Sequence, residues 1–323
     1  MRLKMFWSKP VHFSSIDVLW AFLASCFIVA FGLYKALSRL PRNYEKSFGV
    51  VIFQDVIRYG KTKQNLKRDD WLRVFDVPKR WFWHFYAVSV CWTGFLLFFY
   101  ATSLFQRHPL PSCLTWSLFF LTGGTRSTDA ERDVPQMTTL LLLFLLWVHT
   151  FRRLLECCFV SVFSDGVIHV VQYLFGLVYY MVLGLTALCS DHILKRDSSR
   201  LLTQVNWCHV AGCALFVLAS LLQHRSLALL AKLRTGESGN VETMAHKMPT
   251  GGGFELVSCP HYFAEVLIYI SLWVASGGLF TWWLVSLYVF FNQALAAQLC
   301  HDHYKCKFES YPRQRKAFIP FVL

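Results

Sequence analysis

Uninterrupted apolar stretches of bilayer length recur along this chain, and they constrain its fold more than any other feature. A helix needs about 20 apolar residues to cross the hydrocarbon core of a bilayer, and water-soluble domains rarely contain several such runs. Only 16% of the 323 residues are charged, and the mean hydropathy is +0.40. The sequence therefore predicts an all-α integral membrane protein with about seven transmembrane helices, at residues 16–37, 82–105, 137–160, 167–189, 208–230, 262–278 and 279–299.

Three details of this layout follow from the lengths of the runs. The apolar residues 113–121 are too few to cross a bilayer, so we expect a re-entrant or interfacial piece there. Gly277-Gly278 separates the last two spans, which could instead form one long bent helix. The first run is too long for the core of a cleaved signal and is expected to be a retained signal anchor. Residues 1–323 are therefore treated as one membrane-embedded domain, with a signal-anchor region at 1–50 and a helix bundle at 51–323.

The distribution of basic residues predicts an orientation in the membrane. The segment between the first two spans carries eleven Lys or Arg residues, whereas the basic residues of the next loop, at 106–136, are balanced by acidic ones. Cytosolic loops of membrane proteins collect Lys and Arg, so the first segment is expected to be cytosolic. Alternation then places the N-terminus on the lumenal side and the C-terminus in the cytosol. The same rule accounts for the net charge of +13, and we expect no nucleic-acid partner.

The eleven cysteines are expected to be small buried hydrophobes, because several of them fall inside the apolar runs. The sequence contains no CxxC pair and no His/Cys spacing typical of zinc, so we predict no metal site.

Ionisable and amide side chains inside a span are costly and are therefore candidates for function. His149, Arg152, Arg153 and Glu156 follow one another at i, i+3, i+4 and i+7, which places them on one face of the third span. They could be arginines that extend to the membrane surface with a local carboxylate partner, or the wall of a polar cavity that accepts phosphate. Gln172, near the start of the fourth span, is a buried amide that needs partners.

An acidic residue stands just before the second span. Asp76 is followed by Pro78 and then by an aromatic-rich helix that carries His84 and Tyr86. The carboxylate could be no more than a helix N-cap. Alternatively, apolar surroundings raise its pKa and hold a proton that a reaction requires.

Two further polar stretches lie on the expected cytosolic side. Residues 246–258 contain three consecutive glycines, which do not form the GxGxxG pattern of a dinucleotide-binding βαβ unit. Residues 301–321 combine basic residues with many aromatics and prolines, so we expect an ordered tail packed on the cytosolic face.

These stretches resemble a known family. The pattern His-x-x-Tyr, followed by Phe-x-x-Tyr-Pro and by Arg-Lys-Ala-Phe-Ile-Pro-Phe, spans residues 301–321 and resembles the C-terminal end of the steroid 5α-reductases. Residues 249–265 resemble a cytosolic loop of the same family at matching spacing. Residues 52–63, 75–80 and 160–164 are similar to the polyprenol reductase branch, so the resemblance runs from about residue 50 to the end.

The resemblance implies a multi-pass reductase of the endoplasmic reticulum membrane that uses NADPH to saturate a carbon–carbon double bond. In this branch the substrate is the α-isoprene unit of a polyprenoid lipid, on the route to dolichol for protein N-glycosylation. A 3-oxo-5α-steroid 4-dehydrogenase activity is the alternative within the family. A membrane methyltransferase of the isoprenylcysteine type, or a seven-span receptor or transporter, is the alternative outside it.

The resemblance also assigns roles to residues. Asp76 matches the family's catalytic glutamate, and we add His84 and Tyr86 as candidate catalytic partners. The residues assigned to the cofactor are Arg152, Arg153, Gln172, Arg234, Lys247, Glu255, His261, Glu265, Asn292, His301, Tyr304 and Arg315. Three positions depart from the family pattern: Thr150 stands where the steroid enzymes have a tyrosine, His261 stands for an asparagine, and Ala296 stands for an arginine. Because alanine at position 296 cannot bind an anion, we expect Arg152, Arg153 or Asn292 to bind the cofactor there instead.

The chemistry of hydride addition favours an aldehyde as the direct substrate. An isolated alkene beside an alcohol cannot accommodate the charge that hydride addition leaves, whereas an α,β-unsaturated aldehyde delocalises this charge onto its oxygen. We therefore expect polyprenal to be reduced directly, with protonated Asp76 on the carbonyl. The long lipid tail is expected to leave the bundle sideways into the bilayer.

Overall fold

The computed structural model describes residues 13–39, 47–64, 66–123, 135–190, 201–235 and 240–322. The first twelve residues and the charged loop positions 124–134, on which the orientation prediction partly depends, lie outside this part of the chain.

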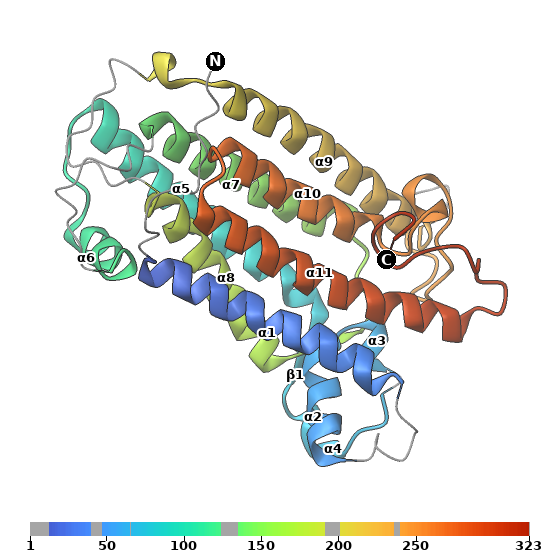
Figure 1. Cartoon of the computed structure of the whole chain (residues 1–323). Coiled ribbons are helices and arrows are strands. Elements are labelled where there is room, and N and C mark those ends of the chain that lie inside the picture. The colour runs from blue at the N-terminus through green and yellow to red at the C-terminus, as the bar shows by residue number, and fades with distance from the viewer. Residues whose placement is uncertain are drawn as a thin grey trace.

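Long helices occupy all seven of the predicted stretches and pack side by side in a bundle (Figure 1). They are α1 (Ser15–Leu37), α5 (Phe82–Phe105), α7 (Gln136–Leu155), α8 (Val170–Leu188), α9 (Trp207–Lys232), α10 (Pro260–Ala275) and α11 (Phe280–Lys307). Within the described ranges, five helical stretches are long and apolar enough to cross a membrane: α1, Lys79–Phe105, α8, α9 and α11. The chain is thus a helical membrane protein, and the crossing of α7 and α10 and the direction of all seven helices stay predictions.

Capping residues fix the ends of the helices that border the bundle. Ser14 and Asp17 form a reciprocal capping box at the start of α1. At the end of α10, Gly277 and Gly278 adopt φ angles of +75° and +83°, and the Gly278 N–H donates to the carbonyl of Trp273 over 3.1 Å. This left-handed termination ends the helix outright. The last two predicted spans are therefore separate helices and not one bent helix.

Shorter elements lie at both ends of the bundle. The apolar stretch predicted at 113–121 forms α6 (Ser112–Leu121). The basic segment after α1 folds into α2 (Phe48–Ile57), α3 (Lys61–Gln64) and α4 (Asp70–Arg73). Single turns occur at Lys79–Trp81, Leu202–Gln204 and Gly252–Glu255, and a π-helical turn at Glu156–Val160 continues α7.

A two-stranded ribbon departs from the all-α expectation. Strand β1 (Asp76–Pro78) pairs antiparallel with β2 (Val167–His169), so that Asp76 lies opposite His169. The ribbon joins the start of α5 to the start of α8, two segments about 90 residues apart in the chain. It fixes the entrance of both helices beside the basic segment.

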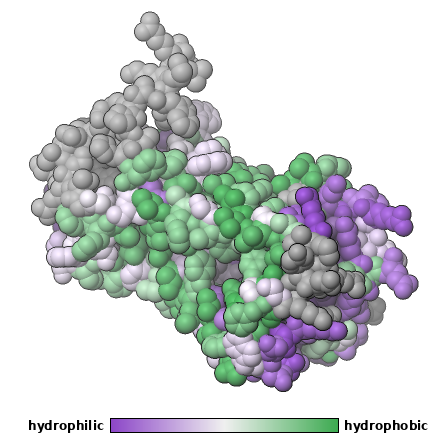
Figure 2. Space-filling view, turned by 60° about the horizontal axis from the view of Figure 1, so that its bottom comes forward, coloured by the Kyte–Doolittle hydropathy of each residue, from purple (hydrophilic) through white to green (hydrophobic). Residues whose placement is uncertain are grey.

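The core lies where α10 packs against α9 and α11, α1 against α11, and α5 against α7 and α8. Trp20 and Trp282 are fully buried there, and the Trp20 indole N–H donates to the hydroxyl of Thr186 over 2.9 Å. Such a partner is required for a polar atom inside a membrane bundle. Figure 2 shows hydrophobic residues over the body of the bundle and hydrophilic residues gathered at one end.

Candidate active site

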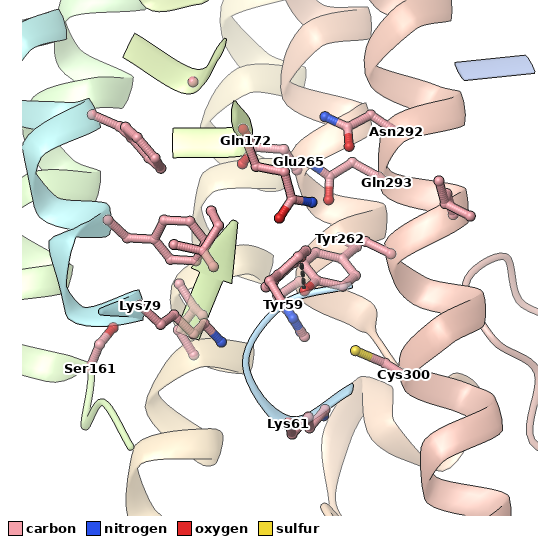
Figure 3. Close-up of a pocket in the computed structure, with 18 of the residues that line it drawn as sticks. Tyr59, Lys61, Lys79, Ser161, Gln172, Tyr262, Glu265, Asn292, Gln293 and Cys300 are labelled. Carbon is pink, nitrogen blue, oxygen red and sulfur yellow. Dashed lines mark hydrogen bonds between the residues drawn. The ribbon is translucent and has the colours of Figure 1, made fainter. Parts of the chain in front are cut away.

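A cavity of about 710 Å³ lies inside the bundle, between the middle of α1 and the C-terminal half of α11. Residues from all seven long helices and from α2, α3 and β2 line it, together with the loops at 161–164 and 245–247. Its volume is typical of a site for a small molecule or cofactor. Figure 3 shows amide and carboxylate groups at one end, Lys61 and Lys79 toward the other, and Tyr59 and Tyr262 between them. The hydroxyls of these two tyrosines are 2.8 Å apart.

Basic side chains outnumber acidic ones among the charged residues that line the cavity. Five basic side chains line it, and Glu265 is the one carboxylate among the described lining residues; the basic residues are Lys61, Lys79, Arg153, Arg234 and Lys247. Lys61 Nζ donates to the Tyr304 hydroxyl over 2.6 Å. Arg234 lies 3.0 Å from Nε2 of His246, and burial together with this guanidinium lowers the pKa of His246 to about 3. The imidazole is therefore neutral at physiological pH, and the excess of positive charge favours an anionic ligand.

The backbone explains how Lys61 and Lys79 come together. Gly60 adopts φ +54°, and its N–H donates to the carbonyl of Val167 in β2 over 2.7 Å. A larger residue at position 60 would be strained at this φ, and its Cβ would lie 2.9 Å from Nζ of Lys79 and displace that side chain. The turn at Gly60 thus brings the lysine that follows it beside the lysine that follows the β1 strand.

A polar network holds the opposite wall. Glu265 Oε1 lies 3.3 Å from His149 Nε2, and its other oxygen accepts a hydrogen bond from the Gln223 amide. Gln172 Oε1 and His261 Nδ1 are buried and form no hydrogen bond with the described part of the chain. Buried polar atoms are normally paired, so these two atoms indicate a polar ligand that completes the site.

Tyr86 and Arg153 form the best-placed acid in the cavity. The Tyr86 hydroxyl accepts hydrogen bonds from Nε and Nη2 of Arg153, over 3.3 and 3.2 Å. Arg153 is in turn paired with Glu156. Because the Tyr86 oxygen only accepts from Arg153, its own proton can be donated into the cavity. The guanidinium also stabilises the negative charge that the hydroxyl gains as it donates.

Asp76 does not have the environment expected from the sequence. It is absent from the cavity lining and pairs with Lys63 Nζ at 2.9 Å and with both terminal nitrogens of Arg68. Burial favours the neutral acid, but hydrogen bonds from Arg68 and Lys63 outweigh it and lower the pKa of this carboxyl. The expectation of a raised pKa was therefore wrong. The cause is a pair of cations that the chain folds back from positions 63 and 68.

The fifteen predicted site residues, Asp76 included, divide into two groups. The cavity wall contains nine of the fifteen: Tyr86, Arg153, Gln172, Arg234, Lys247, His261, Glu265, Asn292 and Tyr304. The remaining six, which do not line it, are Asp76, His84, Arg152, Glu255, His301 and Arg315.

These outer residues contact protein groups. His84 Nδ1 lies 2.8 Å from the Tyr173 hydroxyl, and Arg152 contacts Glu156 and Gln223 behind the wall. The last three lie where the tail packs on the loop that contains Glu255. His301 Nδ1 lies 2.6 Å from the Ser258 hydroxyl, and Arg315 donates to the carbonyl of Pro249 over 2.9 Å while lying 3.6 Å from Glu255. The isolated bridge between Val257 and Lys316 agrees with the ordered tail that the sequence predicts.

Thr150 does not take the place of the family tyrosine. Its side chain is fully buried and its hydroxyl donates to the carbonyl of Leu146 one turn earlier, over 3.1 Å. It is not part of the cavity lining. Within the cavity, the tyrosine hydroxyl that meets an arginine comes instead from α5, at Tyr86.

Sequence reasoning missed Lys61, Lys79 and Cys300 as lining residues. The two lysines were counted as loop charges and lay in stretches that resemble the polyprenol reductase branch, but neither was given a role in the site. Gly60 was the signal that could have singled out Lys61, because turns with successive backbone N–H groups form anion-binding concavities. Cys300 offered no signal beyond its place in an apolar run.

The cavity also reaches the outer surface of the bundle. Cys26 of α1 and Val171 of α8 both line it, yet both are exposed, Val171 at 54%. Phe27, Phe53 and Phe175 complete an apolar side of the cavity between these helices and α2. A ligand with a polar head and a long apolar chain can therefore extend from the cavity toward the lipid.

The chain is similar to known proteins over most of its length. The family model described as 3-oxo-5-alpha-steroid 4-dehydrogenase matches residues 200–323. A polyprenal reductase of Danio rerio is 56% identical over 312 residues, which cover 96% of this chain and 98% of the relative. Polyprenal reductases of Xenopus tropicalis and Homo sapiens are 54% and 43% identical, over 84% and 98% of this chain and 88% and 99% of their own lengths.

Proposed function

Because this chain belongs to the polyprenal reductase family, we propose that it is the oxidoreductase that saturates the α-isoprene double bond of polyprenal, with NADPH as the reductant. The full-length similarity to proteins of that name carries the proposal. The cavity supports it, because cations, unpaired polar atoms and a lipid-side opening meet in one place. Saturation of polyprenal would place the enzyme on the route to dolichol, the lipid carrier of N-glycosylation.

The residues present fit NADPH. The phosphates would be held by Lys61, Arg234 and Lys247 at the cationic end, since these side chains meet no carboxylate of the described lining there. The nicotinamide carboxamide would pair with Gln172 and Glu265, where a buried acceptor atom has no protein partner among the described residues. When bound, NADPH supplies the hydride that the reaction consumes.

The protein's own groups would then act on the carbonyl end of the substrate. Tyr86 would donate its proton to the aldehyde oxygen, and Arg153 would stabilise the charge that develops there. The resulting enol would return this proton to Tyr86 while its α-carbon takes up a proton from solvent, which gives the saturated aldehyde. Four tyrosines of α8, α10 and α11 surround this point and exclude water, namely Tyr179, Tyr180, Tyr269 and Tyr288. Asp76, held as an ionised carboxylate by Arg68, would position the ribbon that carries Lys79.

The membrane arrangement belongs to the same proposal. We place the end that holds the cavity on the cytosolic side of the membrane, where the basic segment between α1 and α5 belongs. Seven crossings then put the N-terminus in the lumen of the endoplasmic reticulum. NADPH would enter from the cytosol, while the polyprenyl chain would remain in the bilayer beside α1 and α8.

Oxidation of NADPH by the purified protein in detergent tests the function directly. Polyprenal, polyprenol and testosterone are offered in parallel. We expect turnover of polyprenal, and little with the alcohol because it offers no electron sink. Equal turnover of polyprenol would refute the aldehyde argument. Turnover of testosterone alone would overturn the substrate, and binding of S-adenosylmethionine without NADPH consumption would overturn the reaction class.

A further inference from the structure

The segment 47–78 folds into a small lobe whose interior is charged. Asp55 is fully buried and Lys63 is 1% exposed, and their side chains are 3.1 Å apart. Arg68 Nη1 lies 2.7 Å from Asp55, and both cations also contact Asp76. Two acids and two bases therefore form a neutral cluster at the centre of the lobe. Asp55 is the one buried residue of α2, a helix made almost entirely of apolar residues.

The outside of the lobe is apolar over a continuous area. Phe48, Trp71, Val74 and Phe75 are 67%, 46%, 82% and 42% exposed. The rings of Phe48 and Trp71 stack with centroids 6.2 Å apart, and Trp71 meets Phe75 edge to face at 6.4 Å. We call these four residues the aromatic patch. A lobe surrounded by water on all sides would not be expected to expose these rings while it buries two ion pairs.

The place of the lobe on the bundle says what covers the patch. The lobe projects sideways beside the last turns of α1 and does not extend along the bundle axis (Figure 1). Phe53 and Ile57 of α2 pack against a buried cluster that contains Tyr34 of α1. Tyr34 lies three residues before the end of this candidate span, which is about 4.5 Å at the rise of an α-helix. The lobe is therefore at the level of the membrane surface.

We propose that the lobe is seated in the bilayer leaflet on the cavity side, with the aromatic patch inserted among the lipids. The occupant is the lipid of that leaflet. Exposed Asp70 and Arg73 on the same short helix α4 would remain at the water side. An apolar face below a polar face is the pattern of an element that lies in the membrane interface. This position also explains the charged interior. Charged side chains next to lipid need partners within the protein, and the two acids and two bases of the lobe pair with one another.

The lobe also forms one wall of the cavity. Phe53 and Val56 of α2 line the cavity on the side that contains Phe27 of α1. A lobe seated in the leaflet thus places this apolar wall at the depth of the lipid chains. This inference depends on the membrane location of the bundle and not on the reaction, so it can fail while the reductase proposal stands.

Depth-dependent quenching of a fluorescent amino acid tests the proposal in the full-length protein. The probe is introduced at Val74, the patch residue that follows α4, or at Asp70, the first residue of α4, whose side chain is 92% exposed. Both variants are reconstituted into phosphatidylcholine vesicles with or without bromine atoms on the acyl chains. We expect quenching at Val74 to exceed that at Asp70 by at least about twofold, as for a side chain inserted below the headgroups.

Equal quenching at the two positions, or none at Val74, would overturn the proposal. The probe at Phe48 is a second patch position, which decides the matter if the Val74 variant is not recovered folded. NADPH oxidation is measured on the same vesicles. Loss of activity with retained quenching contrast would count against the reductase proposal alone.

Discussion

Replacing Tyr86 by Phe tests the central assignment, because it removes the one oxygen that both faces the cavity and meets Arg153. A donor aimed at a developing oxyanion contributes about 2.7–4 kcal/mol, so kcat for polyprenal should fall about 10²- to 10³-fold. The KM for NADPH should change little, since Tyr86 lies with the substrate carbonyl in this arrangement.

The substitution also lowers stability. The phenolic oxygen accepts two hydrogen bonds from Arg153, and Arg153 keeps its partner Glu156 after the substitution. Each hydrogen bond to a charged group contributes about 1.5–3 kcal/mol, so the variant should be less stable than the wild type, and its rate is measured below its melting temperature.

Tyr100→Phe is the matched control. Tyr100 lies on the same helix, is fully buried, and donates its hydroxyl proton to the carbonyl of Gln136 over 3.3 Å, outside the cavity lining. Rates are measured by stopped-flow NADPH oxidation at a temperature where both variants are folded. A kcat for Tyr86→Phe within about twofold of the control would refute the acid role of Tyr86.

Other outcomes follow from the two charge clusters. Lys61→Met should raise the KM for NADPH at least about tenfold, since it removes a phosphate-directed cation from the cavity wall, whereas exposed Lys67→Met should not; titration with NADPH measures both. Asp55→Asn should destabilise the fold by about 3–5 kcal/mol because it leaves two buried cations, Lys63 and Arg68, to share the single carboxylate of Asp76. Asp70→Asn at the surface should lower the melting temperature little. The pKa of Asp76 is lowered in the fold, so its contribution to stability is present above about pH 4 and is lost as the pH falls below that value. Thermal unfolding from pH 6 to pH 3 should therefore show a steeper decline in the wild type than in Asp76→Asn, and parallel curves would contradict the ionised state.

The helices could be predicted from the sequence because bilayer length and apolar composition are local properties. The start of α1 and the end of α10 are also set by neighbouring residues, namely Ser14 and the Gly277-Gly278 pair. The β1–β2 ribbon was not predictable, since its three-residue strands carry no periodicity and pair across about 90 residues. Its register is decided by the charge cluster around Asp55 and by the contact of Gly60 with Val167.

The candidate site shows the same division. The family pattern and helical spacing located nine lining residues, among them Glu265 and Arg153. These residues could be found because motif spacing and the faces of single helices are local properties of the sequence. The environment of Asp76 could not be inferred, since a carboxylate beside an apolar run gives no sign of cations that return from positions 63 and 68. Lys61 was visible only as a loop charge, and its place in the cavity wall depends on a backbone turn and on the β2 strand.

One physical requirement connects the lobe, the cavity and the acid. A polyprenoid has a reactive head that needs a polar, water-excluding site and a tail that is stable only in lipid. The cavity meets both needs, because its lining has exposed residues on α1 and α8 for the tail and basic side chains with buried polar atoms for the head. Ion pairs around Asp55 hold the α2 wall of the cavity in place. A purely apolar core would be less specific here, because its side chains could contact the surrounding lipid equally well. The carboxylate of Asp76 is needed, ionised, for that pairing, and an ionised carboxylate has no proton to donate. In the proposed mechanism the proton for the aldehyde therefore comes from another group, and Tyr86 is the group that the geometry provides.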